Sequence, residues 1–218
     1  MDISYFFGLF RQLIPGLQYT LGLFAITLLI SLPLGLLLSF VRASRFKALR
    51  GILGVYIWLM RGTPLLLQLY FFYYGLTFIP GIGEYLVMDR FQAACVAFVL
   101  NYAAYFCEIF RGGLLSVDKG QYEAAKVLGF SGWQTSTKIV IPQMFRVCLP
   151  SLGNECITLV KDTSLITAIG VTELLYFAKS AVNRDVNATA YLVAALFYLA
   201  MTLVLTKILE RMEKKVSY

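Results

Sequence analysis

Residues 12–41 read QLIPGLQYTLGLFAITLLISLPLGLLLSFV and contain no Asp, Glu, Lys or Arg. About 20 apolar residues in a helix span the hydrocarbon core of a bilayer, so this run is long enough to cross it. It is too long for the apolar core of a secretory signal peptide, and no small-residue cleavage pattern follows it. The run therefore predicts a permanent transmembrane helix, which we expect over residues 16–41.

The composition of the whole chain agrees with a bilayer environment. Of its 218 residues, 59% are hydrophobic and only 14% are charged, and the mean hydropathy is +0.74. A soluble domain carries about 25% charged residues. The net charge of +7 could indicate nucleic acid binding, but the basic residues lie between apolar runs, where membrane topology accounts for them. We therefore expect no nucleic acid partner.

Residue types on which metal sites and many catalytic sites depend are scarce in this chain. There is no His, and the four cysteines are scattered through apolar sequence without a zinc-type spacing. This disfavours a metal site and His-dependent catalysis. We expect the cysteines to pack as small apolar residues and the chain to have no enzymatic activity of its own.

Further apolar segments predict four more membrane spans, near residues 52–79, 91–110, 150–177 and 186–206. The second is interrupted near its start by Arg61, Gly62 and Pro64. The fourth is expected to begin at Pro150, because proline suits the first turn of a helix. No internal repeat or low-complexity tract is present. The sequence thus predicts an all-α membrane protein with one domain, residues 1–218, and five transmembrane helices.

The distribution of Lys and Arg predicts the orientation of these spans. Basic residues collect in segments 42–50, 111–149 and 207–215, whereas the opposite side carries only Arg11, Arg90, Lys179 and Arg184. Cytoplasmic loops have an excess of Lys and Arg. We therefore expect the N-terminus outside the cell and the C-terminus in the cytoplasm.

The predicted cytoplasmic loop, residues 111–149, contains a compact helical element. Residues 119–130 read KGQYEAAKVLGF, in which apolar positions recur at helical spacing, and Gly129 is placed as a helix stop. Ser131 and Gln134 have the spacing of a capping box that opens a second helix, which Pro142 is expected to end. We call residues 119–142 the elbow. It is either a docking element for a partner or an ordinary solvated loop.

The elbow resembles the EAA loop of ABC importer permeases. The residues that carry the resemblance are Glu123-Ala124-Ala125, then Gly129, Ile139 and Ile141-Pro142, with Ile141 where the family has Leu. In that family the loop forms a coupling helix that inserts into a cleft of the ATP-hydrolysing subunit. The resemblance implies that Glu123, Ala124, Ala125 and Gly129 couple this chain to an ATPase.

Four other stretches are similar to the polar amino acid (histidine, glutamine, arginine) branch of those bacterial permeases: RGTPL at 61–65, NYAAY at 101–105, DKGQ at 118–121 and KDTSL at 161–165. The resemblance implies a permease of the bacterial cytoplasmic (inner) membrane that pairs with a second copy or a sister permease. It also implies two ATPase subunits and an extracytoplasmic amino acid-binding protein. The chain has no P-loop motif, so ATP and Mg are expected on the partner ATPase and no cofactor on this chain.

Three charged residues lie within the predicted fourth span. Glu155 and Asp162 are seven residues apart, about 20° around a helix axis, and Lys161 projects about 100° from Asp162. Exposed to lipid, the three would cost on the order of 8–10 kcal/mol by simple addition, so they must face a cavity, a partner helix or each other. An amino acid offers both charges: Lys161 could hold its carboxylate and Asp162 or Glu155 its ammonium.

Several alternatives stay open at this point. A remaining acid would favour a cationic side chain such as that of arginine, lysine or ornithine, but the charges could also form an ion pair that only fastens helices together. A methionine or opine importer is possible within the same class. From another class, an ATP-independent secondary carrier could use Glu155, Lys161 and Asp162 directly, although it would not explain the elbow. An intramembrane enzyme is disfavoured by the absence of His.

Other polar residues of the spans have simpler interpretations. Glu108 lies one turn from Arg111, which predicts an intrahelical ion pair near the cytoplasmic boundary. Arg61 is expected to anchor its helix at the cytoplasmic headgroups by snorkelling. The hydroxyls of Thr163 and Ser164 are expected to bond backbone carbonyls one turn back.

Overall fold

The computed structural model describes residues 3–44 and 46–216, and within these ranges all regular structure is helical. Among the described residues, three helices are long and apolar enough to cross a membrane by themselves: α1 (Ile3–Arg42), α4 (Arg90–Ser116) and α9 (Thr189–Val216). Two bent helix pairs raise the number to as many as five. The expected fold class, an all-α membrane protein, is confirmed.

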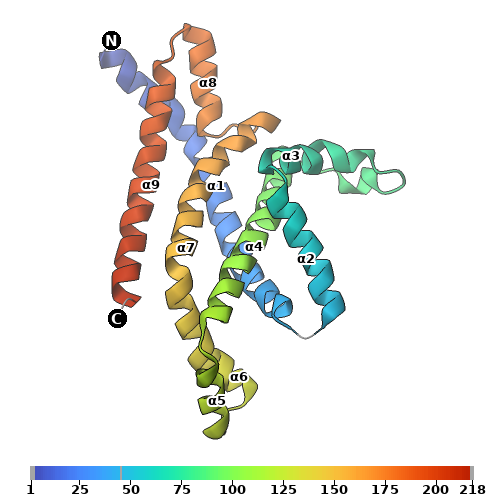
Figure 1. Ribbon diagram of the computed structural model, residues 1–218. Coiled ribbons are helices and arrows are strands. Elements are labelled where there is room, and N and C mark those ends of the chain that lie inside the picture. Colours follow the sequence, from blue (N-terminus) through green and yellow to red (C-terminus); the bar gives the residue numbers. More distant parts are fainter. Residues whose placement is uncertain (1–2, 45, 217–218) are drawn as a thin grey trace.

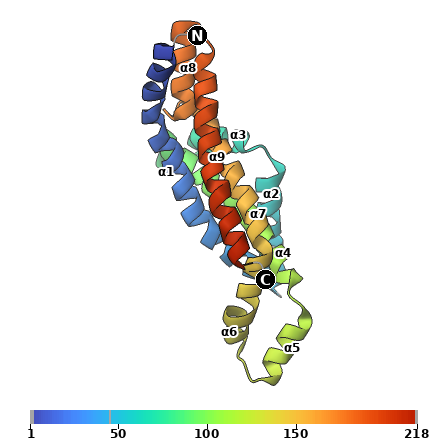
Figure 2. The same ribbon diagram turned by 90° about the vertical axis from the view of Figure 1, so that its left-hand side faces the viewer.

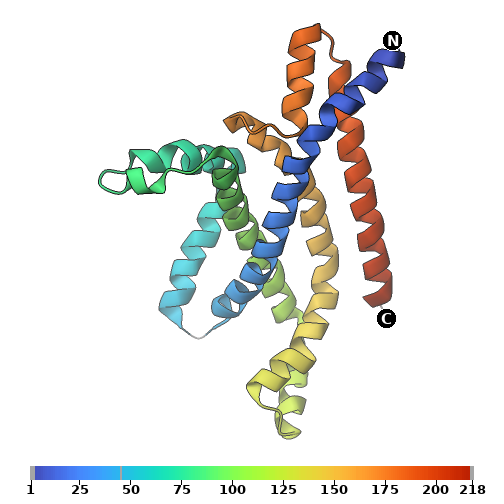
Figure 3. The same ribbon diagram turned by 180° about the vertical axis from the view of Figure 1, so that it is seen from behind.

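The long helices form one bundle that narrows toward the elbow (Figure 1). Helix α4 runs beside α7 (Ile141–Asp162), and both lead to the short helices α5 (Lys119–Val127) and α6 (Gly132–Thr135). Figure 2 shows that α5 and α6 project beyond the end of α9. Figure 3 shows α1 crossing the near face of the bundle obliquely, and the N-terminal end of α1 lies at the end of the molecule away from the elbow.

Helix α1 begins at Ile3, well before the expected residue 16, and a stripe of small residues packs it against the bundle. The buried positions include Gly16, Thr20, Thr27, Ser31, Gly35 and Ser39. Without a hydrophobic force between helices in lipid, close packing of small residues drives their association. At Gly35 a Cβ atom would lie 2.6 Å from Cβ of Phe106, so only glycine allows α1 and α4 to approach so closely here.

The interruption in the expected second span is a sharp bend. Helix α2 (Lys47–Gly62) ends where α3 (Leu65–Tyr70) begins, and the chain turns there by 106°. Thr63 is extended, with φ −119° and ψ 148°, because a following proline disfavours the helical conformation. Beyond α3 lie three short helices, η1 (Phe71–Gly75), η2 (Leu76–Phe78) and η3 (Gly83–Leu86).

The second bent pair joins α7 to α8 (Leu174–Asp185) at an angle of 55°. Between them, η5 (Thr163–Ile169) ends at Gly170, whose φ of +79° is a left-handed conformation that suits glycine. Two expectations at the other end of α7 are wrong. Pro142 opens α7, and Pro150 lies inside it. The π-helix η4 (Ser136–Val140) carries the chain from α6 directly into α7. Pro142 is tolerated in the first turn of α7 because the N–H that proline lacks has no partner within a helix at that position.

Candidate functional site

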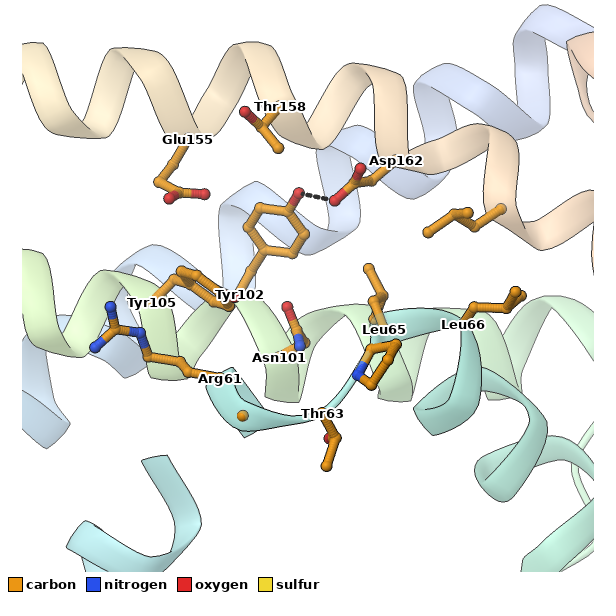
Figure 4. Close-up of a pocket in the computed structure, with 13 residues that line it drawn as sticks. Arg61, Thr63, Leu65, Leu66, Asn101, Tyr102, Tyr105, Glu155, Thr158 and Asp162 are labelled. Carbon is orange, nitrogen blue, oxygen red and sulfur yellow. Dashed lines mark hydrogen bonds between the residues drawn. The ribbon is translucent and has the colours of Figure 1, made fainter. Parts of the chain in front are cut away.

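A cavity of about 610 Å³ lies where the bend between α2 and α3 faces α4 and α7 (Figure 4). We call it the polar cavity, because charged and polar side chains from three separate elements gather in an otherwise apolar protein. Those side chains are Arg61, Thr63, Asn101, Tyr102, Tyr105, Glu155, Thr158 and Asp162.

Two of the three charged residues expected on the fourth span line this cavity together. Glu155 and Asp162 both project into it from α7, as their spacing of seven residues predicts. The hydroxyl of buried Tyr102 donates to Oδ2 of Asp162 at 2.8 Å, so α4 fixes one carboxylate oxygen and leaves the other free to accept. That these acids bind substrate stays a prediction.

Lys161 is not brought into the polar cavity. It lines a separate hollow of about 310 Å³ together with Ser164 and with residues of α8 and α9. Adjacent residues of a helix project about 100° apart, and here that angle separates Lys161 from Asp162 by the body of α7. A role for Lys161 in binding a carboxylate stays a prediction. Its side chain lies in a different hollow from the carboxylates of Glu155 and Asp162. The hydroxyls of Thr163 and Ser164 bond Val160 O and Lys161 O, which confirms their expected structural use.

The cation that does line the polar cavity is Arg61, and its expected role as an anchor of α2 at the headgroups stays a prediction. Its guanidinium carbon lies 5.1 Å from the ring centroid of Tyr105, a cation–π arrangement. Sequence reasoning missed this position, although a signal was present: Arg61 stands directly before the Gly-Thr-Pro break, and breaks in membrane helices are tolerated where they line a cavity.

Two buried amides hold the bend in place. Gln68 on α3 donates from Nε2 to Met60 O at 2.9 Å and to the Oγ1 atom of Thr63 at 2.8 Å. Asn101 on α4 donates from Nδ2 to the same Met60 O and to Oε1 of Gln68, both at 3.0 Å. The last carbonyls of a helix lack partners within it, so these bonds satisfy the end of α2 inside the protein.

The elbow has the local structure that the sequence predicts. Gly129 has φ +76°, and the N–H groups of Gly129 and Phe130 bond Lys126 O and Ala125 O, a Schellman ending of α5. Ser131 and Gln134 form the expected capping box at α6. Glu123, Ala124 and Gly129 are exposed, whereas Ala125 is only 1% exposed.

Apolar side chains on the elbow are left uncovered by this chain. Val127 is 88% exposed, and Leu128 and Trp133 are also highly exposed. At the base of the elbow, Arg111 Nη2 bonds Glu108 Oε2 at 2.6 Å, which confirms the expected ion pair, and Arg42 Nε of α1 approaches Glu108 at 3.8 Å.

Glu173 is a buried acid that sequence reasoning did not single out. It is 0% exposed and begins α8, where its Oε1 accepts from Tyr176 N and from Thr167 Oγ1, both at 2.7 Å. Its Oε2 accepts from the hydroxyl of Tyr198 on α9 at 2.9 Å. An acidic residue at the N-cap satisfies free N–H groups, so this acid fastens η5, α8 and α9 together.

The fold and the polar cavity define a class, a helical membrane permease. Residues 31–218 match the family described as "Binding-protein-dependent transport system inner membrane component", and the chain belongs to this family. It is 38% identical to the glutamine transport system permease protein GlnP of Escherichia coli over 94% of this chain and 93% of GlnP. It is 37% identical to the arginine transport system permease protein ArtQ of Bacillus subtilis over 94% of this chain and 92% of ArtQ.

The fold is also similar to a solved structure. The crystal structure of an amino acid ABC transporter with histidines contains a chain that is 31% identical, with a TM-score of 0.87 and coverage of 99% of both chains. The resemblance to ABC importer permeases that the elbow and the other stretches indicate is thereby confirmed.

Proposed function

We propose that this chain is the transmembrane subunit of an ATP-driven importer, and that its polar cavity binds a polar amino acid, with basic side chains favoured. The observation that carries the proposal is the pair of carboxylates, Glu155 and Asp162, in one cavity of a chain from this permease family. Relatives that transport glutamine and arginine support an amino acid as the cargo.

The chemistry of the pair fits a cationic ligand. Two ionised carboxylates on one face of α7 repel each other, and partial burial within a membrane protein makes the charge of each more costly. A ligand with an α-ammonium and a second cation, as in arginine, relieves both costs by charge-assisted hydrogen bonds. A neutral polar side chain engages one acid only, and this difference gives the preference for basic amino acids.

The energy for transport comes, in this proposal, from partner subunits. Two ATPases bind ATP and Mg and contact the elbow, with Glu123, Ala124 and Gly129 on the exposed surface beside Val127 and Leu128. A second permease copy or a sister permease completes the path, and an extracytoplasmic binding protein delivers the amino acid. The chain crosses the inner membrane five times, with its N-terminus outside and its C-terminus in the cytoplasm.

Alternating access links these parts. Closure of the ATPases moves the elbow, which continues into α7 through η4 without a loop, so the motion reaches the helix that carries both acids. A secondary carrier would use the same acids but would need no ATPase.

Uptake by the reconstituted complex separates the two functions. Proteoliposomes with the binding protein outside should accumulate labelled L-arginine, L-glutamine or L-histidine only when ATP is enclosed, and a non-hydrolysable analogue should not support uptake. Uptake at an equal rate without ATP would replace this proposal by the secondary carrier.

A further inference from the structure

We propose that Arg61 is the carboxylate-binding group of the polar cavity, and that Gln68 and Asn101 are positioning residues that hold it there. This inference rests on the proposed amino acid site and adds to it the group that recognises the anionic end of the ligand. It assigns to Arg61 the role that sequence reasoning gave to Lys161.

The guanidinium of Arg61 lines the polar cavity and has N–H groups available to a ligand. Within residues 3–44 and 46–216 the guanidinium packs on the ring of Tyr105 and makes no salt bridge, although Glu155 and Glu108 lie near enough to feel its charge. A contact with the ring face leaves the N–H groups at the edge of the guanidinium free, and their planar fork matches a carboxylate in two parallel hydrogen bonds. In Figure 4, Arg61 lies on the side of the cavity opposite Glu155 and Asp162.

This arrangement separates the two charges that an amino acid ligand requires. The acids of α7 face the ammonium and a cationic side chain, while Arg61 on α2 faces the carboxylate. Arg61 also stands in the last turn of α2, where the helix dipole favours a cation. The dipole therefore helps to keep the guanidinium at the cavity in the absence of ligand.

The amide pair determines where Arg61 stands. Met60, the preceding residue, has a carbonyl that accepts from both Asn101 Nδ2 and Gln68 Nε2. Asn101 is 4% exposed and Gln68 is 6% exposed, so no bulk water can replace these bonds. The end of α2 is thus fixed from two sides at the residue before Arg61.

One face of α4 holds both the backbone and the side chain at this point. Asn101 and Tyr105 lie one turn apart on α4, and they contact Met60 O and the Arg61 guanidinium, two adjacent residues of α2. Loss of the amide bond frees the end of α2 to move away from α4. The guanidinium then leaves the ring of Tyr105, and the fork no longer faces the carboxylate.

The test compares each amino acid with its decarboxylated amine. Binding to the complete permease–ATPase complex is measured for L-arginine, L-glutamine and L-histidine, and for agmatine, 4-aminobutanamide and histamine. Arg61→Gln should weaken binding of the preferred amino acid about 10- to 100-fold, as expected for a lost charge-assisted pair. Binding of the matching amine should change less than about threefold.

A double-mutant cycle tests the positioning role. Asn101→Leu alone should weaken binding of the amino acid about tenfold, a coupling usual for residues that share a network, and should add nothing in the Arg61→Gln background. Asn154→Leu, which changes an exposed asparagine of α7 outside the cavity, is the matched control and should leave binding unchanged.

Three results would overturn the inference in distinguishable ways. If Arg61→Gln weakens amino acid and amine equally, Arg61 does not recognise the carboxylate. If Asn101→Leu weakens binding equally in both backgrounds, or changes only thermal stability, Asn101 does not act through Arg61. If the unsubstituted complex binds none of the three amino acids, the proposed function fails together with the inference.

Discussion

Gly16 offers a sharp test of how α1 packs against the start of α8. A Cβ atom added at Gly16 would lie 2.6 Å from Leu174 N and 2.7 Å from the carbonyl carbon of Glu173. These are backbone atoms and cannot rotate away, so Gly16→Ala must push α1 off the start of α8. Overpacking of this kind costs about 1–3 kcal/mol, and here the upper part of the range applies.

The net effect follows from a second, opposite contribution. Alanine favours a helix over glycine by about 1 kcal/mol, which leaves a net destabilisation of about 1–2 kcal/mol for Gly16→Ala. For a chain of this size, that lowers the unfolding midpoint by about 2–8 °C. Gly8 lies on the same helix with no atom within 4 Å of its added Cβ, so Gly8→Ala should leave the midpoint unchanged or raise it by a few degrees.

The assay is thermal unfolding of the purified complex in one detergent. Its readout is the fraction of the complex that stays monodisperse after heating to each temperature. Both variants carry the same chemical change in the same helix, so detergent effects on α1 cancel in the comparison. If Gly16→Ala unfolds at or above the temperature of Gly8→Ala, the close approach of α1 to Glu173 and Leu174 is not as described.

Three further predictions concern the site, the elbow and the buried acid. Asp162→Asn and Glu155→Gln should each weaken binding of L-arginine about tenfold through the loss of a charge-assisted bond; unchanged affinity in both variants would show that neither acid binds the ligand. Val127→Asp places a charge on the exposed surface of the elbow, so it should abolish transport-coupled ATP hydrolysis while amino acid binding, measured by calorimetry, is retained; full hydrolysis would contradict the coupling role. Glu173→Leu leaves the hydroxyls of Tyr198 and Thr167 and the N–H of Tyr176 without their acceptor, so it should destabilise the protein by about 2–5 kcal/mol. An unchanged unfolding midpoint would show that these hydrogen bonds are not made.

Features that depend on neighbouring residues in the chain could be predicted from the sequence. The stop at Gly129 and the capping box of Ser131 and Gln134 are set within a few residues, and the structure has both. The shared face of Glu155 and Asp162 follows from helical period alone. The positions of proline did not identify helix boundaries uniquely, because a proline can either end a helix or stand in its first turn. Pro142 stands in the first turn of α7, and Pro150 lies inside that helix.

Features that depend on distant segments could not be predicted in this way. The sequence marks the break after Arg61, but the angle of 106° and the amides that fix it come from α3 and α4. Helical period alone separates Lys161 from Asp162 by about 100°, but the hollow that Lys161 lines depends on where α8 and α9 pack. The burial of Glu173 is tolerated because Tyr198, 25 residues away, donates a hydrogen bond to it, and no local pattern indicates that partner.

Whether this chain works as the membrane subunit of an ATP-driven importer can be decided by purifying it from its native membrane in mild detergent and identifying the accompanying proteins by mass spectrometry. We expect an ATPase with a P-loop motif in stoichiometric amount, and we expect it to be lost from the Val127→Asp variant. A chain that is purified alone through several detergents, and still binds amino acids, would contradict this expectation and favour an ATP-independent carrier.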